Sequence, residues 1–138
     1  MNKEQLMKLI RKHEGLRLYP YMDTENKLTI GYGRNLEDRG ISLKTAVDML
    51  EEDVELALKE SKKHEFFYEL DDVRQNVIIE MIFNLGPTRF RGFKRMISAL
   101  NSKDYSLAAS EMLDSLWAKQ VGPRANRLSD MMKTGKFL

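Results

Sequence analysis

The chain has 138 residues, of which 42% are hydrophobic and 32% charged, and this content supports one folded unit with a core rather than a disordered chain. Because there is no cysteine, disulfide scaffolds, thiolate zinc sites and cysteine nucleophiles are excluded together. The net charge of +2 is too small for a dedicated DNA-coating protein.

The first segment predicts an amphipathic helix that ends at about Glu14. Apolar residues recur at helical spacing from Leu6 onward, and Asn2 followed by Gln5 is typical of a capping box. Gly15 would end the helix. Charged residues interrupt the apolar ones, so the segment lacks the apolar region of a signal peptide. No other stretch reaches the ~18 uncharged apolar residues of a membrane span, and we expect a cytosolic chain that crosses no membrane unaided.

Residues 16–33 change to a period of two, which predicts a small antiparallel sheet. Apolar residues alternate with polar or small neighbours, and residues 23–26 supply the chemistry of a turn between the strands. Gly31 and Gly33 lie inside the second predicted strand. Glycines in such places indicate a bulge or a close approach of the backbone to another group.

The rest of the chain is predicted to be helical. Ser42 opens a helix of about twenty residues, long enough to connect two lobes, and its acidic residues, Glu60 among them, would face water. Asp71 or Asp72 caps a helix that is apolar nearly all round and is expected to be buried. Further helices are expected over residues 93–100, over residues 105–116 and from Pro123 to Lys133.

The two histidines and the missing cofactor motifs exclude several kinds of catalytic site. His13 and His64 lie far apart in the sequence, so there is no HExxH-type metal pair, and we expect no catalytic metal and no cofactor. We expect His64 to be a solvated surface residue. The sequence also lacks a G-x-S-x-G elbow, a P-loop and a dinucleotide-binding loop.

Carboxylate chemistry remains open, because it needs two carboxyl groups in different environments across a cleft. Glu14 at a helix end and Asp23 at a turn have the asymmetry that a general acid and a general base require. Spacing alone does not separate this hypothesis from a simpler one. In the simpler one, Glu14 is an exposed helix-end acid and Asp23 is an ordinary turn residue.

The order of the residues strongly resembles the signature of the phage-type lysozymes, glycoside hydrolase family 24. In that family E-G-L-R-L, a downstream Asp-Thr and T-I-G-x-G form the active site. Here these motifs correspond to the segment that begins at Glu14, to Asp23 and Thr24, and to residues 29–33. The resemblance continues through LDDVRQNVIIEMIFNLG and on to Arg127, so it covers nearly the whole chain.

The resemblance implies an α+β, mostly α, lysozyme-like fold of two lobes. A small β-hairpin lobe would span residues 14–40, a long connecting helix residues 42–62, and a helical lobe residues 66–138. The helix over residues 2–13 would pack on the helical lobe. The implied activity is that of an endolysin muramidase. Such an enzyme hydrolyses the β-1,4 bond between N-acetylmuramic acid and N-acetylglucosamine in bacterial peptidoglycan, by acid/base catalysis with inversion, and causes host lysis.

The resemblance also assigns roles to residues. Glu14 would protonate the leaving oxygen, Asp23 would activate water, and Thr29 would help to hold that water. The alternative for Thr29 is a β-branched residue present for strand propensity. The substrate-binding positions of the family correspond to Gly33, Asn35 and Phe83.

Three departures from the family pattern concern substrate contacts rather than catalysis. Arg34 stands where a well-known member of the family has a His, and the link from Gly33 to the long helix is shorter. Two sugar-contacting positions correspond to Met96 and Glu111, which are different residue types.

The partners implied by the resemblance are peptidoglycan and a holin that opens the inner membrane. Until then the protein would stay in the host cytoplasm, as a monomer, without nucleic acid and without stable membrane insertion. One alternative is a non-catalytic wall- or nucleic-acid-binding domain, because Phe90 and Phe93 interleave with basic residues in the way that backbone binding with base stacking uses. Phe93 also fits the predicted core stripe. A third possibility is a transglycosylase with the same fold.

Overall fold

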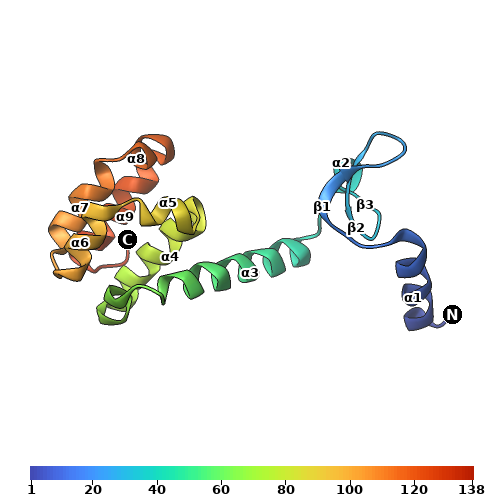
Figure 1. The fold of residues 1–138 in the computed structure, drawn as a ribbon, viewed down its shortest axis with the longest axis horizontal. Helices are drawn as coiled ribbons and strands as arrows, with labels where there is room; N and C mark the ends of the chain where they lie inside the picture. The colour runs from blue at the N-terminus through green and yellow to red at the C-terminus, as the bar shows by residue number, and fades with distance from the viewer. The chain divides into compact units, whose positions relative to one another are not determined.

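The structure, a computed structural model, describes residues 1–138 and divides the chain into two compact units, Met1–Asp48 and Met49–Leu138 (Figure 1). Helices dominate, and one small antiparallel sheet of three strands is present, which confirms the predicted α+β, mostly α class. No helix combines the length and the apolar content needed to cross a membrane.

The unit Met1–Asp48 consists of one helix, a sheet and a short helical turn. In chain order its elements are α1 (Lys3–Glu14), β1 (Arg17–Met22), β2 (Leu28–Gly31), β3 (Arg34–Asn35) and α2 (Leu36–Arg39). The start of α1 follows the predicted cap, because the Asn2 side chain accepts a hydrogen bond from the Gln5 amide at 3.0 Å. Its end also follows the prediction, with Gly15 at a φ of 72° directly after Glu14.

The sheet has the order β1-β2-β3, with both pairs antiparallel. A register shift between Arg17 and Tyr21 marks an irregularity in the pairing of β1 with β2. The β1–β2 connection is the turn that the sequence predicts at residues 23–26, with Asn26 in the left-handed region at a φ of 62°. The sheet therefore contains two of the residues predicted to be catalytic, Asp23 in the β1–β2 turn and Thr29 on β2.

The long helix α3 (Leu43–Ser61) begins where the prediction places it, because the Ser42 hydroxyl accepts a hydrogen bond from the Thr45 amide at 3.1 Å. The unit Met49–Leu138 contains the rest of this helix and the elements that follow it. These are η1 (Glu65–Glu69), α4 (Asp72–Leu85), α5 (Pro87–Arg91), α6 (Lys94–Asn101), α7 (Tyr105–Leu113), α8 (Leu116–Val121) and α9 (Pro123–Thr134).

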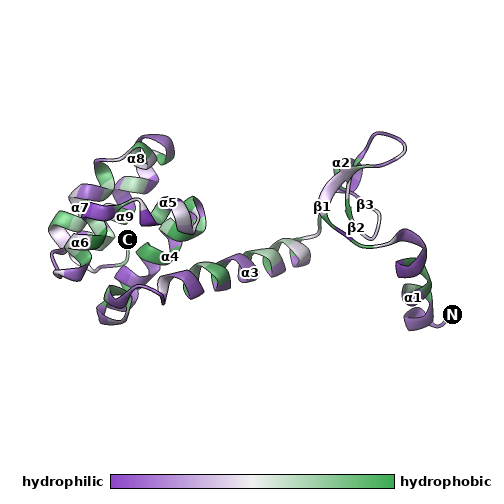
Figure 2. Cartoon of the chain, viewed as in Figure 1, coloured by the Kyte–Doolittle hydropathy of each residue, from purple (hydrophilic) through white to green (hydrophobic).

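The core of the second unit forms around α4, as its nearly continuous apolar sequence predicts. Val77, Ile78 and Met81 are fully buried, and residues from α5 to α9 pack in the same cluster. Figure 2 shows hydrophobic stretches alternating with hydrophilic ones along the helices of this unit. Such a pattern lets each helix bury one face and expose the other.

The helix predicted over residues 105–116 is wrong at its end. α7 stops at Leu113, and α8 begins at Leu116. The Ser115 hydroxyl accepts a hydrogen bond from the Ala118 amide at 3.1 Å and so caps α8. The apolar spacing continues across this break, which is why the sequence pattern does not reveal it.

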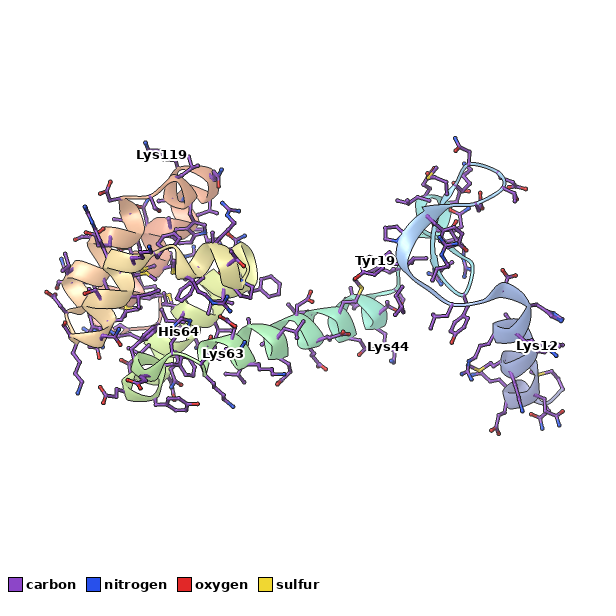
Figure 3. All side chains as sticks on the ribbon, in the orientation of Figure 1. Lys12, Tyr19, Lys44, Lys63, His64 and Lys119 are labelled. Carbon is purple, nitrogen blue, oxygen red and sulfur yellow. The ribbon has the colours of Figure 1, made fainter.

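Glu60 and His64 also differ from their predictions, since neither faces water. Glu60 is 4% exposed, and Arg91 donates two hydrogen bonds to its Oε1, at 2.9 Å from Nε and 2.6 Å from Nη2. Lys63 lies 3.1 Å from the other carboxylate oxygen. His64 and Lys63 follow the C-terminal end of α3 (Figure 3). The His64 ring packs against the rings of Phe66 and Phe90, and its Nε2 is buried without a hydrogen-bond partner.

Candidate active site

Glu14 is the last residue of α1 and is exposed within its unit. Its carboxylate lies directly against the backbone of Gly33, because a Cβ atom built on that glycine would lie 2.7 Å from Glu14 Oε2. The prediction that Gly33 lies inside a strand is wrong, because β2 ends at Gly31 and Gly33 lies in the β2–β3 turn, but the predicted close approach of the backbone to another group is present there. At Gly31, by contrast, no atom lies within 4 Å of the corresponding position.

Asp23 lies in the turn after β1, and backbone groups hold its carboxylate. The amides of Glu25 and Lys27 both donate to Asp23 Oδ1, each at 2.8 Å. The Asp23 amide in turn donates to the Lys27 carbonyl at 2.9 Å. Asp23 is thus an Asx-turn residue, as the simpler hypothesis states, but the turn also fixes the orientation of the carboxyl group. Oδ2 accepts no hydrogen bond from the protein, so it remains available to a water molecule.

Thr29 is buried in the middle of the sheet, at 2% exposure, and pairs with Tyr21 on β1 and Asn35 on β3. Its hydroxyl donates to the Lys27 carbonyl at 2.8 Å. The hydroxyl proton is therefore in use, and the free lone pairs of the oxygen can accept a hydrogen bond from water.

The backbone of Lys27 links two of the catalytic candidates, Asp23 and Thr29. Its amide donates to Asp23, and its carbonyl accepts from both the Asp23 amide and the Thr29 hydroxyl. Sequence reasoning did not find this residue, because backbone groups leave no signal in the residue type. The link fixes the turn and the strand relative to each other without help from an apolar core.

Asn35 has a structural task in addition to any contact with substrate. Its Oδ1 accepts from the Asp38 amide at 3.0 Å, which caps α2, and its Nδ2 donates to the Asp38 carboxylate at 3.0 Å. Of the six residues that the sequence predicts for the site, five lie in Met1–Asp48. Phe83 belongs to the second unit, where it is 41% exposed and lines a hollow of about 420 Å³ with Asp53, Leu56 and Pro87.

The two substrate positions that depart from the family pattern lie together in the second unit. Met96 and Glu111 line the same hollow, of about 510 Å³. Arg89 and Lys94 bring positive charge to its wall, and Asp114 adds a negative one. This hollow therefore has mixed charge and is unlike the uniformly basic grooves that track a nucleic-acid backbone.

The aromatic residues of the basic segment are structural. Phe90 is completely buried, and Phe93 packs edge-on against Trp117 with 6.3 Å between ring centroids. Arg91 is engaged with Glu60. Phe93 therefore packs against the core cluster, as its place in the predicted core stripe indicates, and Phe90 offers no exposed ring for the base stacking on which the nucleic-acid alternative depends.

The titratable side chains of Met1–Asp48 that bear on the site are two carboxyl groups. No cluster of three or more His, Asp or Glu side chains is arranged to hold a metal ion. The chemistry available in Met1–Asp48 is that of one exposed carboxyl group at a helix end and one carboxyl group fixed by backbone amides.

Comparison with known proteins shows the family to which the chain belongs. The family model described as phage lysozyme matches residues 11–132. The chain therefore belongs to the phage lysozyme family. It is a glycoside hydrolase of the lysozyme class, a muramidase-type hydrolase of peptidoglycan.

Three similar proteins illustrate the range of this family. A probable T4-type lysozyme 1 of Dictyostelium discoideum is 27% identical over an alignment 158 positions long, gaps included, with 92% of each chain covered. An endolysin of Acyrthosiphon pisum secondary endosymbiont phage 1 is 30% identical over 125 residues, which cover 88% of this chain and 84% of that protein. The pre-baseplate central spike protein Gp5 of Enterobacteria phage T4 is 25% identical over an alignment 161 positions long, gaps included, which covers 96% of this chain and 28% of that protein.

Proposed function

We propose that the protein is an endolysin that hydrolyses the β-1,4 bond between N-acetylmuramic acid and N-acetylglucosamine with inversion at the anomeric carbon. The observation that carries this proposal is the geometry of Asp23, whose carboxylate is oriented by two backbone amides and linked through Lys27 to the Thr29 hydroxyl. An oriented carboxylate with one free oxygen suits a general base that activates a water molecule.

Glu14 is the general acid in this proposal and protonates the oxygen of the leaving sugar. The carboxyl group lies at the surface of its unit, where a glycan can reach it, and no group of residues 1–48 donates a hydrogen bond to it. Thr29 accepts a hydrogen bond from the water that Asp23 activates. Neither step requires a metal or a cofactor.

Release from the cell is a separate part of the proposal. We expect a monomer that stays in the host cytoplasm until a holin opens the inner membrane, and that then reaches the wall and lyses the cell. Expression in a Gram-negative host without a holin should leave the cells intact until the inner membrane is permeabilised. Spontaneous lysis without membrane damage would contradict this part and leave the catalytic part untouched.

The stereochemistry of the product tests the catalytic proposal. Proton NMR of the first-formed reducing end should show the α-anomer from a β-linked substrate, because water attacks the face opposite the leaving group. A β-anomer as the initial product would make Asp23 a nucleophile and overturn its role as a base. Mass spectrometry of the released muropeptides provides the second arm, since an anhydro product would identify a transglycosylase instead of a hydrolase.

A further inference from the structure

The last turn of α1 contacts the β2–β3 turn at two points. The guanidinium carbon of Arg11 lies 6.0 Å from the centroid of the Tyr32 ring, within the range of a cation–π contact. The Glu14 carboxylate lies against Gly33, the next residue of the same turn. Arg11 and Glu14 are three positions apart on α1 and so share one face of the helix.

Two conditions favour glycine at position 33, and a Cβ atom there would displace the Glu14 carboxylate. Its φ of +75° lies in the left-handed region, and the space that a side chain would fill is occupied by the Glu14 carboxylate, at 2.7 Å from Oε2 and 3.2 Å from Cδ. Gly31 meets only the first condition, because its φ is +72° and nothing lies within 4 Å of the corresponding position. The chain thus offers two glycines with nearly the same backbone strain, of which one contacts Glu14.

Little else within the unit Met1–Asp48 determines where the Glu14 carboxylate lies. No residue of this unit donates a hydrogen bond to it, in contrast to Asp23, which receives two. The residue that follows, Gly15, has a φ of 72° and ends the helix immediately. Within this unit, the contacts of Arg11 and Glu14 with the β2–β3 turn are the ones that bear on the direction of the carboxyl group relative to the sheet.

We propose that Tyr32 and Gly33 are positioning residues for the general acid, with Gly33 providing a side-chain-free slot for the Glu14 carboxylate and Tyr32 anchoring the helical turn through Arg11. This inference rests on the proposed role of Glu14. It gives Gly33 a task different from the substrate contact that the family resemblance implies. The slot and the anchor act on turnover, because they set the direction from which the proton is delivered.

The decisive test compares Gly33→Ala with Gly31→Ala, using solubilised linear glycan strands so that kcat and KM are measured separately. A misplacement of about 1 Å can cost about 100-fold in rate, so we expect Gly33→Ala to lower kcat by about that factor with KM little changed. Gly31→Ala should lower kcat far less, although both variants carry similar backbone strain. Thermal unfolding of both variants checks that each is folded under the assay conditions.

A second set of variants tests the anchor. Tyr32→Leu and Arg11→Met should each lower kcat about two- to fivefold, the size expected of one exposed cation–π contact. Tyr32→Phe keeps the ring and should restore turnover. Lys12→Met removes a neighbouring charge that has no partner on the turn and is the matched control for Arg11→Met. Equal effects of Arg11→Met and Lys12→Met would show that only net charge matters and would overturn the anchor.

Glu14→Gln in the same assay separates failure of this inference from failure of the proposed function. If Glu14→Gln is inactive and Gly33→Ala is as active as Gly31→Ala, the slot is wrong while the general acid stands. If Gly33→Ala raises KM and leaves kcat unchanged, Gly33 is a substrate contact and the positioning role is overturned. If Glu14→Gln retains most activity, the proposed role of Glu14 fails, and the inference fails with it.

Discussion

The two units of the chain are held together in different ways. Taken by itself, Met1–Asp48 has one fully buried residue, Thr29, and its geometry comes from a capped helix, an Asx turn and a three-stranded sheet. Met49–Leu138 contains the whole cluster of buried apolar residues, from Ala57 to Met132. The residues proposed for catalysis lie in the unit that relies on hydrogen bonds and turns.

This difference implies a division of tasks between the units. Buried apolar area is the main source of folding free energy, so the core of Met49–Leu138 should contribute strongly to the stability of the protein. Hydrogen bonds contribute less to net stability, but they are directional and fix the orientation of a carboxyl group well. Substitutions in the two units should therefore separate loss of stability from loss of activity. The packing of the helix over residues 2–13 on the helical lobe stays a prediction.

The largest effect on stability is expected from Phe90→Ala. This side chain is completely buried, and the substitution should lower the free energy of unfolding by about 3–5 kcal/mol. The matched variant in the first unit is Tyr19→Ala, which removes a ring of similar size that is 83% exposed and should change stability by less than about 0.5 kcal/mol. Urea unfolding of both variants measures the difference. Equal destabilisation would mean that the outer face of β1 is packed in solution and would break the comparison between units.

A large effect on activity with a small one on stability is expected from Thr29→Val. The substitution keeps the shape of the side chain and deletes the hydroxyl that donates to the Lys27 carbonyl, at a cost of about 1 kcal/mol in stability. Turnover should fall by about 100-fold, because the proposed water loses the group that holds it near Asp23. Thr29→Ser keeps the hydroxyl and should retain most of the turnover. If Thr29→Val and Thr29→Ser are equally active, the hydroxyl has no role in turnover, and Thr29 is present only for its strand propensity.

Much of the local geometry of the helices and turns could be predicted from the sequence, because it depends on residues that are neighbours in the chain. Asn2 as a cap, Gly15 as a helix end and the turn after Asp23 all act over four residues or fewer, and each is confirmed. The buried character of α4 follows from its composition alone. The same reasoning predicted the position of Glu14 at the end of α1.

Features that depend on distant residues could not be predicted in this way. Glu60 is spaced like a solvent-facing acid on α3, and only the fold brings Arg91 to it from 31 positions further along the chain. The burial of His64 has the same origin, since it packs against Phe90. The link through the Lys27 backbone was missed because hydrogen bonds of main-chain groups do not depend on residue type.

The burial of Glu60 leads to the smallest of the expected effects, a change in stability that depends on pH. Burial alone would raise the pKa of Glu60, but hydrogen bonds and charges from Lys63 and Arg91 outweigh it and hold the pKa below its ordinary value of 4.5. A carboxyl group whose pKa is lowered by folding stabilises the folded state above its unfolded pKa, and this contribution is lost as the pH falls through the folded value. Glu60→Gln should therefore destabilise the protein by about 1–3 kcal/mol at pH 7 and progressively less below pH 4.5.

Glu69→Gln is the matched control for this pH series. Glu69 also forms an ion pair, with Lys103 at 3.2 Å, but both side chains are largely exposed. Exposed pairs contribute about 0–1 kcal/mol, so its melting temperature should follow the wild type across the pH range. A Glu60→Gln variant that behaves like Glu69→Gln would show that burial does not strengthen the Arg91 pair.

The central claim is that catalysis depends on the carboxyl group of Glu14, in the unit without a core of its own. The most direct measurement is the clearing of a purified wall suspension by wild type, Glu14→Gln and Glu4→Gln, with thermal unfolding of each protein. Glu4 is an exposed acid in the first turn of the same helix and serves as the control. We expect Glu14→Gln to lose activity by about 100- to 10,000-fold, the usual contribution of a general acid, with its melting temperature unchanged, while Glu4→Gln clears the wall like the wild type. A Glu14→Gln protein that keeps more than about a tenth of wild-type activity would contradict the claim.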